Sequence, residues 1–358
     1  MDMPAASDAT REEAPMSADL VAPVALSRER RAFDALAPLS LCVAGAVALT
    51  LHKLLPNGQH ADPTRLYPHL LLGVIVAGLV LSLLRVVQPK SGLAARAIGW
   101  CLRTAPIVAA GVLLLCAWDL ITLKLNWMPL PYFPGPDGVL QTLVDDWRSA
   151  GAGQPGLAEC ITHSLILLFS GYLAGSVIGI ICGVLIGWYA PARYWGMPIM
   201  KIVGPIPATA LIPMALMLFP SPLLSAVSLI ALAVWFPVAM LTLSGVSNTR
   251  QSYLDVARTL GAKQSYLVLR VAIPAATPSI FVGLFMGLGS SFLTLIVAEA
   301  VGVQAGLGWY IDWAQAYSDY KKVYAALVIM SVFFSTIMTL LFRVRDRVLV
   351  WQKGTIKW

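Results

Sequence analysis

Long apolar blocks alternate with short polar segments along the chain after residue 35. Each block is about 20 residues long, the length of α-helix that crosses roughly 30 Å of hydrocarbon. The pattern predicts an all-α, polytopic membrane protein with eight transmembrane helices. The expected spans are 36–53, 66–87, 104–123, 162–188, 199–219, 223–246, 275–298 and 323–342. Only Pro220-Ser221-Pro222 separates 199–219 from 223–246, so a single re-entrant hairpin is the alternative for that pair.

Lys and Arg residues are unevenly divided between the polar segments. Six lie in 52–65, 124–161 and 299–322, whereas fifteen lie in 85–103, 189–201, 247–272 and 343–358. Positive residues accumulate in cytoplasmic loops, so the richer set and both termini are predicted to be cytoplasmic. The net charge of +7 follows this topology and forms no basic stripe interleaved with aromatic residues. Nucleic acid is therefore not an expected partner, whereas membrane lipid is.

Composition divides the chain into four parts. The whole chain is 58% hydrophobic and 12% charged, but residues 1–35 are rich in Ala, Asp, Glu, Pro and Ser. We expect 1–35 to be a disordered cytoplasmic tail; a cleaved signal peptide is the alternative. Residues 36–103 form a two-span N-terminal extension with a cytoplasmic linker, residues 104–350 hold six spans, and residues 351–358 form a cytoplasmic tail.

Glycines recur every four residues in the span 162–188. Four residues turn an α-helix by about 400°, so such glycines form a slowly drifting groove on one side. Small residues let helix backbones approach closely in a membrane. We expect this face to pack against another helix. Two glycines with the same spacing in 275–298 are expected to form a second, shorter packing face. The helix-packing positions are Gly171, Gly175, Gly179, Gly183, Gly187, Gly283 and Gly287.

Three prolines interrupt the span 199–219. Each removes a backbone N–H and bends or breaks a helix, and broken helices in membranes often line a solute path. A plain kink in a packed helix is the equally weighted alternative. Glu299 joins the candidates because an ionisable residue in a span is a functional candidate by default, although capping by an interfacial acid is the commoner role. The candidate path residues are Pro205, Pro207, Thr209, Pro213, Ser290, Ser291, Thr294 and Glu299.

A polar segment lies between two apolar blocks at Asp255–Pro274. Its spacing resembles the cytoplasmic coupling loop of ABC importer permeases, written E-A-A, three residues, G, nine residues, I-x-L-P. Asp255, Val256 and Ala257 stand for the triplet, Gly261 for the glycine and Val271 with Ile273-Pro274 for the ending. An ordinary basic connection is the alternative. The expected coupling residues are Asp255, Val256, Ala257, Arg258, Gly261, Ala262, Tyr266 and Pro274.

Three further stretches resemble the nitrate, sulfonate and taurine permease group. They are Pro205-Ile206-Pro207 followed by Ala210-Leu211-Ile212-Pro213, Trp118-Asp119 followed by Met128–Pro136, and Val297–Gly302 followed by Gly306-Leu307-Gly308. The resemblance covers about 104–350 and leaves the first two spans unexplained. It implies a six-span core that carries the solute path.

The resemblance implies a non-catalytic transmembrane subunit of an importer in the bacterial inner membrane. The expected partners are a cytoplasmic ABC ATPase, an extracytoplasmic solute-binding protein and a second permease subunit, as a homodimer. The sequence has no G-x-x-x-x-G-K-[ST] loop, so ATP and Mg are expected on the ATPase. No cofactor is expected in this chain, and the scattered Cys and His residues indicate no metal site. The expected solute is a small anion such as nitrate, a sulfonate, taurine or bicarbonate. A stand-alone secondary transporter or a non-transporting scaffold is the alternative.

Overall fold

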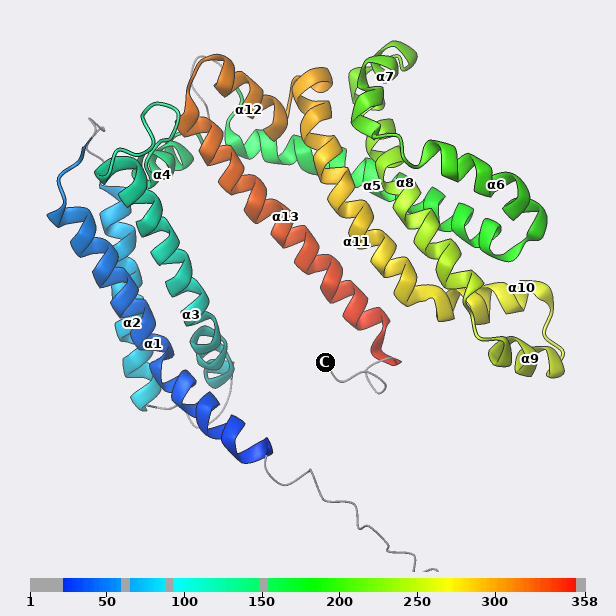
Figure 1. The fold of residues 1–358 in the computed structure, drawn as a ribbon, viewed down its shortest axis with the longest axis horizontal. Helices are drawn as coiled ribbons and strands as arrows, with labels where there is room; N and C mark the ends of the chain where they lie inside the picture. Colours follow the sequence, from blue (N-terminus) through cyan, green and yellow to red (C-terminus); the bar gives the residue numbers. More distant parts are fainter. Residues whose placement is uncertain (1–21, 59–64, 88–92, 148–153, 352–358) are drawn as a thin grey trace, which may run out of the picture. The chain divides into compact units, whose positions relative to one another are not determined.

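The structure is a computed structural model that describes residues 22–58, 65–87, 93–147 and 154–351. These ranges are helical and contain no β-strand (Figure 1). The chain divides into two compact units, Met1–Trp127 and Met128–Trp358. The fold is therefore all-α, as the apolar pattern predicts.

The first unit contains three long helices that contact one another: α1 (Ala22–Leu54), α2 (Leu66–Val87) and α3 (Leu93–Asp119). A π-helical turn, η1 (Leu120–Lys124), continues α3. Close packing between α1 and α2 depends on small residues, since a Cβ on Gly78 would lie 2.7 Å from Cys42 Sγ. The span 104–123, which the sequence groups with the six-span core, thus lies within the same compact unit as the two N-terminal helices.

Buried polar contacts join α3 to the end of α1. His52 Nδ1 lies 2.9 Å from Asp119 Oδ2, and the Asp119 side chain is almost completely buried. The Lys124 ammonium donates to the carbonyls of His52 and Leu55 and to Asn57 Oδ1, each at 2.7 Å. A buried ionised group is tolerated only when it is paired in this way, so these contacts fix the register of α3 against α1.

The tails expected at the two ends of the chain are only partly covered by the described residues. The disordered tail expected at 1–35 is wrong for residues 22–35, because α1 begins at Ala22. Those residues are rich in Ala and Arg, which have high helix propensity. Residues 1–21 of the expected N-terminal tail and residues 352–358 of the expected C-terminal tail lie outside the described residues.

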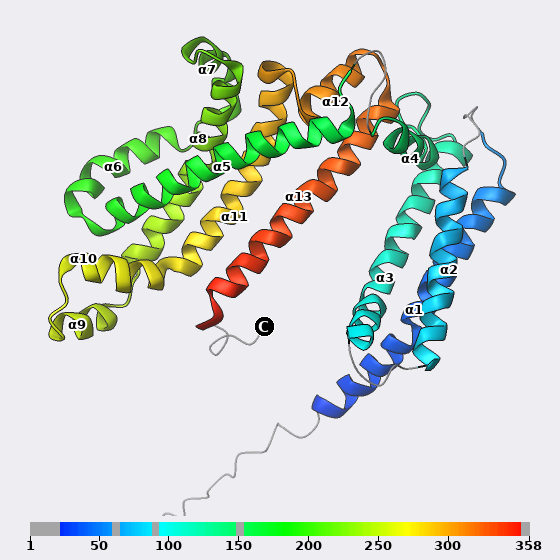
Figure 2. The ribbon, with the colours of Figure 1, turned by 180° about the vertical axis from the view of Figure 1, so that it is seen from behind.

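The second unit contains the remaining helices (Figure 2). They are α4 (Pro136–Asp145), α5 (Leu157–Trp188), α6 (Ala190–Val203), the 3-10 turn η2 (Ala208–Leu211), α7 (Ile212–Leu218), α8 (Pro222–Ser247), α9 (Gln251–Thr259), α10 (Gln264–Tyr266), the π turn η3 (Leu267–Ala272), α11 (Ile273–Ala298), the π turn η4 (Glu299–Val303), α12 (Leu307–Ala316) and α13 (Tyr320–Val348). The segment α9–α10, where the sequence places the expected coupling residues, lies at the opposite end of this unit from α7 and α12 (Figures 1 and 2).

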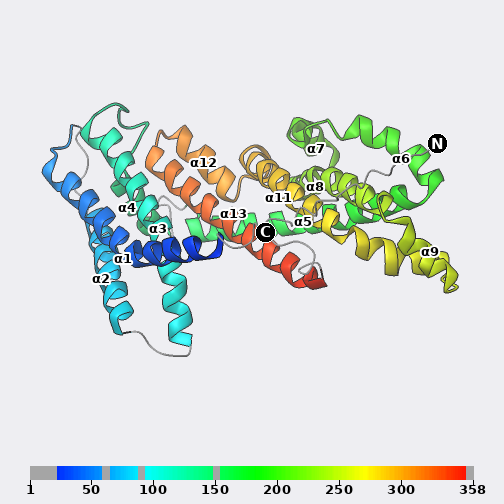
Figure 3. The ribbon, with the colours of Figure 1, turned by 60° about the horizontal axis from the view of Figure 1, so that its bottom comes forward.

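Helices α5, α8 and α11 run side by side at the centre of the second unit (Figure 3). The five glycines of α5 face α8: a Cβ on Gly175 would lie 2.9 Å from Ala231 Cα, and one on Gly183 would lie 2.6 Å from the Ala239 carbonyl oxygen. Gly283 and Gly287 of α11 also meet α8, at Val234, Pro237 and Val238. The sequence-identified glycines therefore lie at the two contacts where α8 is closest to its neighbours.

Six helices of the described ranges are long and apolar enough to cross a membrane, or seven if α6 and η2–α7 together form one span. The number of eight stays a prediction, since Pro38–Leu54 is a shorter apolar helix. The expected span 199–219 is not one straight helix, because α6 and η2–α7 meet at 81°. Pro205 and Pro207 lie in the break, where each removes an N–H that a continuous helix needs.

A polar cluster fastens α4, α12 and α13 together near one end of the unit. The Tyr310 hydroxyl donates to Asp146 Oδ2 at 2.7 Å, and Lys322 Nζ lies 3.4 Å from the same oxygen. Burial, and then the neighbouring Asp146 carboxylate, raise the pKa of Tyr310 above its ordinary value. Tyr310 is therefore a neutral hydrogen-bond donor at every physiological pH.

Candidate functional site

Helix α9, which holds the first of the expected coupling residues, ends at a glycine in the left-handed conformation. Gly261 has φ of +79°, its N–H donates to the Arg258 carbonyl at 2.9 Å, and the Ala262 N–H donates to the Ala257 carbonyl at 3.0 Å. These two bonds form a Schellman motif, which satisfies the last carbonyls of α9 and reverses the chain. The glycine that the sequence singled out therefore sets the direction in which the chain leaves α9.

Apolar side chains of this segment divide into a buried set and an exposed set. Leu254, Leu267 and Val268 are buried and hold α9 and η3 together. Tyr253, Val256, Leu260 and Tyr266 are exposed, Leu260 by 83%. They surround a hollow of about 630 Å³ that also includes Ala257, Gly261, Ala262 and Arg270. Contiguous exposed apolar side chains mark an interaction surface.

The other expected coupling residues lie at the edges of this hollow or of the segment. Asp255 and Arg258 form an exposed ion pair at 3.1 Å on α9. Pro274 is the second residue of α11 and directly follows the π turn η3. The eight expected positions thus form one continuous segment, from the first turns of α9 to the start of α11.

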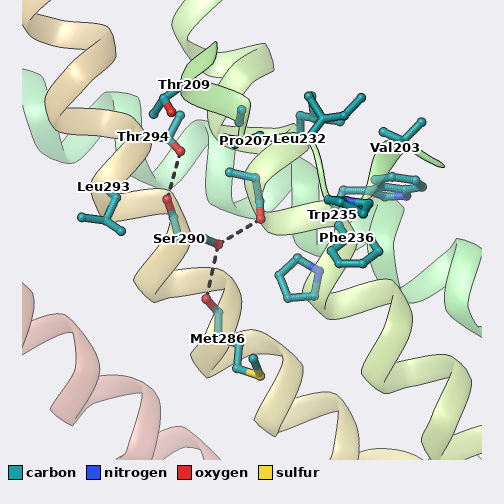
Figure 4. A pocket seen from close by; sticks show the side chains of 16 residues that line it. Val203, Pro207, Thr209, Leu232, Trp235, Phe236, Met286, Ser290, Leu293 and Thr294 are labelled. Atoms are coloured by element: carbon teal, nitrogen blue, oxygen red, sulfur yellow. Dashed lines mark hydrogen bonds between the residues drawn. The ribbon is translucent and has the colours of Figure 1, made fainter. Parts of the chain in front are cut away.

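A second candidate site is a cavity of about 400 Å³ beside the helix break (Figure 4). Its walls are the break at 203–209, the middle of α8 at 232–237, and α11 at 286–294. Five of the expected path residues line it: Pro205, Pro207, Thr209, Ser290 and Thr294. Pro213, Ser291 and Glu299 do not line it.

Pro237 explains how α11 is attached to α8 at this cavity. A proline inside α8 lacks the N–H that would bond to the Ala233 carbonyl four residues earlier. The Ser290 hydroxyl of α11 donates to that carbonyl at 2.9 Å (Figure 4). A backbone group freed by proline is thus satisfied from the neighbouring helix. The sequence prediction named Ser290 but missed Trp235, Phe236 and Pro237, whose signal was a Trp-Phe-Pro run inside an apolar span.

Glu299 does not line the cavity and instead belongs to a buried hydrogen-bond network. Its Oε1 accepts the Ser164 hydroxyl at 2.6 Å and its Oε2 accepts the Gly308 N–H at 2.8 Å. Ser164 in turn accepts the Leu307 N–H at 3.0 Å. Leu307 and Gly308 begin α12, so Glu299 and Ser164 cap the free N–H groups of its first turn. Gly306, with φ of +92°, lies directly against the carboxylate.

Comparison with known proteins identifies the family. Residues 175–349, which include α8–α11 and both candidate sites, match the family described as binding-protein-dependent transport system inner membrane component. A probable ABC transporter permease protein of Brucella abortus is 34% identical over 221 residues, covering 62% of this chain and 86% of that protein.

Two relatives carry more specific names. The taurine transport system permease protein TauC of Escherichia coli is 31% identical over 229 residues, which is 64% of this chain and 82% of TauC. The nitrate import permease protein NrtB of Synechococcus elongatus is 26% identical over 254 residues, which is 69% of this chain and 87% of NrtB. The matches to the Brucella abortus permease and to TauC cover 86% and 82% of those proteins at identities above 30%. This chain therefore belongs to the ABC transporter permeases, the binding-protein-dependent inner membrane components.

Proposed function

We propose that this protein is the transmembrane subunit of an ATP-driven importer and that the exposed face of α9–α10 is the docking surface for its ATPase. The observation that carries the proposal is the Schellman-terminated helix α9, which presents Tyr253, Val256 and Leu260 around an open hollow. A stand-alone carrier has no ATPase for such a surface to bind. Membership of the permease family supports the same assignment.

The mechanism rests on the continuous helical connection between this surface and the cavity. The docking segment continues through η3 into α11, and α11 carries Ser290 and Thr294 of the cavity wall. A push on α9–α10 is therefore transmitted along one helix to the side chains beside the break. In the proposed cycle, ATP-driven closure of two ATPase subunits moves the segment and alternates the access of the cavity.

The remaining partners and the solute follow from the same proposal. ATP and Mg bind to the ATPase, a solute-binding protein delivers the solute from outside, and a second copy of this chain completes the path. Both termini lie on the cytoplasmic side of a bacterial inner membrane, as the distribution of Lys and Arg indicates. The names of TauC and NrtB make taurine and nitrate the first solutes to test.

Gly261→Val is expected to uncouple transport from ATP hydrolysis. A Cβ at this position meets no atom within 4 Å, so the substitution acts through the backbone alone. Left-handed conformation costs an L-residue about 1–2 kcal/mol and is least accessible to β-branched side chains. The Schellman turn is expected to open and misdirect α10. The measurement is solute-stimulated ATPase activity and uptake by the reconstituted importer.

Gly261→Asn is the matched control, because asparagine tolerates the left-handed region better than other non-glycine residues. It is expected to retain most of the coupling, while both variants stay in the membrane at wild-type amounts. Full transport with wild-type ATPase stimulation in Gly261→Val would rule out the docking assignment.

A further inference from the structure

The cavity beside the helix break has neutral walls. None of the sixteen described residues that line it carries a formal charge. Trp235, Phe236 and Met286 are among its large apolar side chains, and Pro205, Pro207 and Pro237 contribute rings without any N–H. Small-molecule sites of roughly 300–1,000 Å³ with apolar walls and few polar groups are typical of organic ligands. The cavity, at about 400 Å³, falls within that range.

The hydroxyl protons of α11 are already used within the protein. Ser290 donates to the Ala233 carbonyl at 2.9 Å, and Thr294 donates to the Ser290 carbonyl at 3.0 Å (Figure 4). The Ile206 N–H donates to the Val203 carbonyl at 3.1 Å. What remains for a solute is neutral: hydroxyl lone pairs, the Thr209 hydroxyl, the Trp235 indole N–H and the first N–H groups of η2.

These walls are unfavourable for a small inorganic anion. Moving an ionised group from water into a low-dielectric site costs far more than neutral hydrogen bonds return, unless an opposite charge lies beside it. No Lys, Arg or His lies among the described lining residues to provide that charge. An uncharged ring, in contrast, gains from burial against the Trp235 and Phe236 rings.

The break also argues that the cavity is occupied by solute and not by lipid. Irregular backbone at membrane depth is tolerated where it lines a polar cavity or is buried in protein, and not where it faces hydrocarbon. The hydroxyls of Thr209, Ser290 and Thr294 gather on this side of the break (Figure 4). An acyl chain would leave their acceptor lone pairs unused.

We infer that this cavity selects an uncharged organic solute with a ring-sized apolar body and discriminates against small inorganic anions such as nitrate and bicarbonate. The inference rests on the proposed importer function and narrows its solute class. It places specificity in the membrane subunit, at Trp235, Phe236 and Met286, in addition to any selection by a solute-binding protein.

The test measures binding by the full-length permease in lipid nanodiscs, without partner proteins. Benzamide, a neutral ring with an amide donor and acceptor, is the probe, and nitrate and methanesulfonate are the comparison ligands. Binding is followed by the ligand-dependent rise in thermal stability, which increases with ligand concentration above Kd. We expect benzamide to stabilise the wild-type protein and nitrate to have no effect.

Met286→Trp and Val282→Trp form the matched pair. Both residues are exposed on α11, by 59% and 49%, and are one helical turn apart, but only Met286 lines the cavity. Tryptophan at 286 is expected to fill the cavity and weaken benzamide binding at least about tenfold, which corresponds to about 1.4 kcal/mol. Tryptophan at 282 is expected to leave it unchanged.

Three results would overturn the inference: wild-type protein that benzamide does not stabilise, equal benzamide binding by the two variants, or nitrate binding that Met286→Trp abolishes. The second includes loss of binding in both variants, because the effect would then not be specific to the cavity. The Gly261 variants test the proposed function separately. A coupled importer that binds nitrate in this cavity would refute the solute class alone.

Discussion

Gly175→Ala is expected to lower the thermal stability and folded yield of the protein more than any other single-methyl substitution in α5. A Cβ at this position would lie 2.8 Å from Val234 Cβ and 2.9 Å from Ala231 Cα, and still closer to the Ala231 carbonyl oxygen. Because two of these atoms belong to the backbone of α8, no rotamer change relieves the clash. Overpacking a close contact typically costs about 1–3 kcal/mol.

Gly289→Ala provides the control on α11, where an added Cβ meets no atom within 4 Å. Alanine in place of glycine inside a helix otherwise stabilises it by about 0.5–1 kcal/mol, so this variant is expected to be as stable as the wild type or slightly more stable. The measurement is the melting temperature in detergent, together with the monodisperse fraction on size exclusion. Equal melting temperatures for the two variants would show that α5 and α8 are not in close contact.

Glu299→Ala is expected to have the second large effect on stability. The substitution leaves the Ser164 hydroxyl and the Gly308 N–H without their buried acceptor, at a cost of about 1–3 kcal/mol for each unsatisfied group. Glu299→Gln keeps one acceptor oxygen, so an intermediate loss is expected.

Asp312→Asn, on the exposed side of α12, is the matched control and is expected to change the melting temperature little. The order of melting temperatures should be wild type and Asp312→Asn, then Glu299→Gln, then Glu299→Ala. A Glu299→Gln variant with wild-type stability and no uptake would contradict the capping role. It would indicate that Glu299 acts in the solute path.

Both large effects concern contacts between segments that are distant along the chain. Ser164 and Glu299 are 135 residues apart, and the N-terminus of α12 joins them only in the folded protein. Losing the Glu299 hydrogen bonds therefore also weakens the packing of α5, η4 and α12 on one another. Glu299 was a candidate for the solute path because of its position in the sequence, but its hydrogen-bond partners are buried groups of the protein.

Local physical chemistry was enough to predict much of this protein from its sequence. The length of each apolar block determines that a helix forms, and the spacing of Gly171 to Gly187 determines that one face of α5 is small. Only glycine readily adopts the φ of +79° found at Gly261, so the turn after α9 could also be predicted from the sequence. The prolines at 205 and 207 likewise predicted a kink or a break, since a missing N–H acts at its own position.

Tertiary structure alone decided which groups meet. Nothing in the sequence specifies that the glycine face of α5 packs on α8, that Ser290 satisfies the carbonyl freed by Pro237, or that the helix ending at Asp119 joins the unit of α1 through His52. Each of these is a choice among several apolar helices that look alike locally. Helix length and turn conformation are set by neighbours in sequence, whereas pairing depends on which complementary surfaces and unsatisfied polar groups the whole fold brings within contact distance.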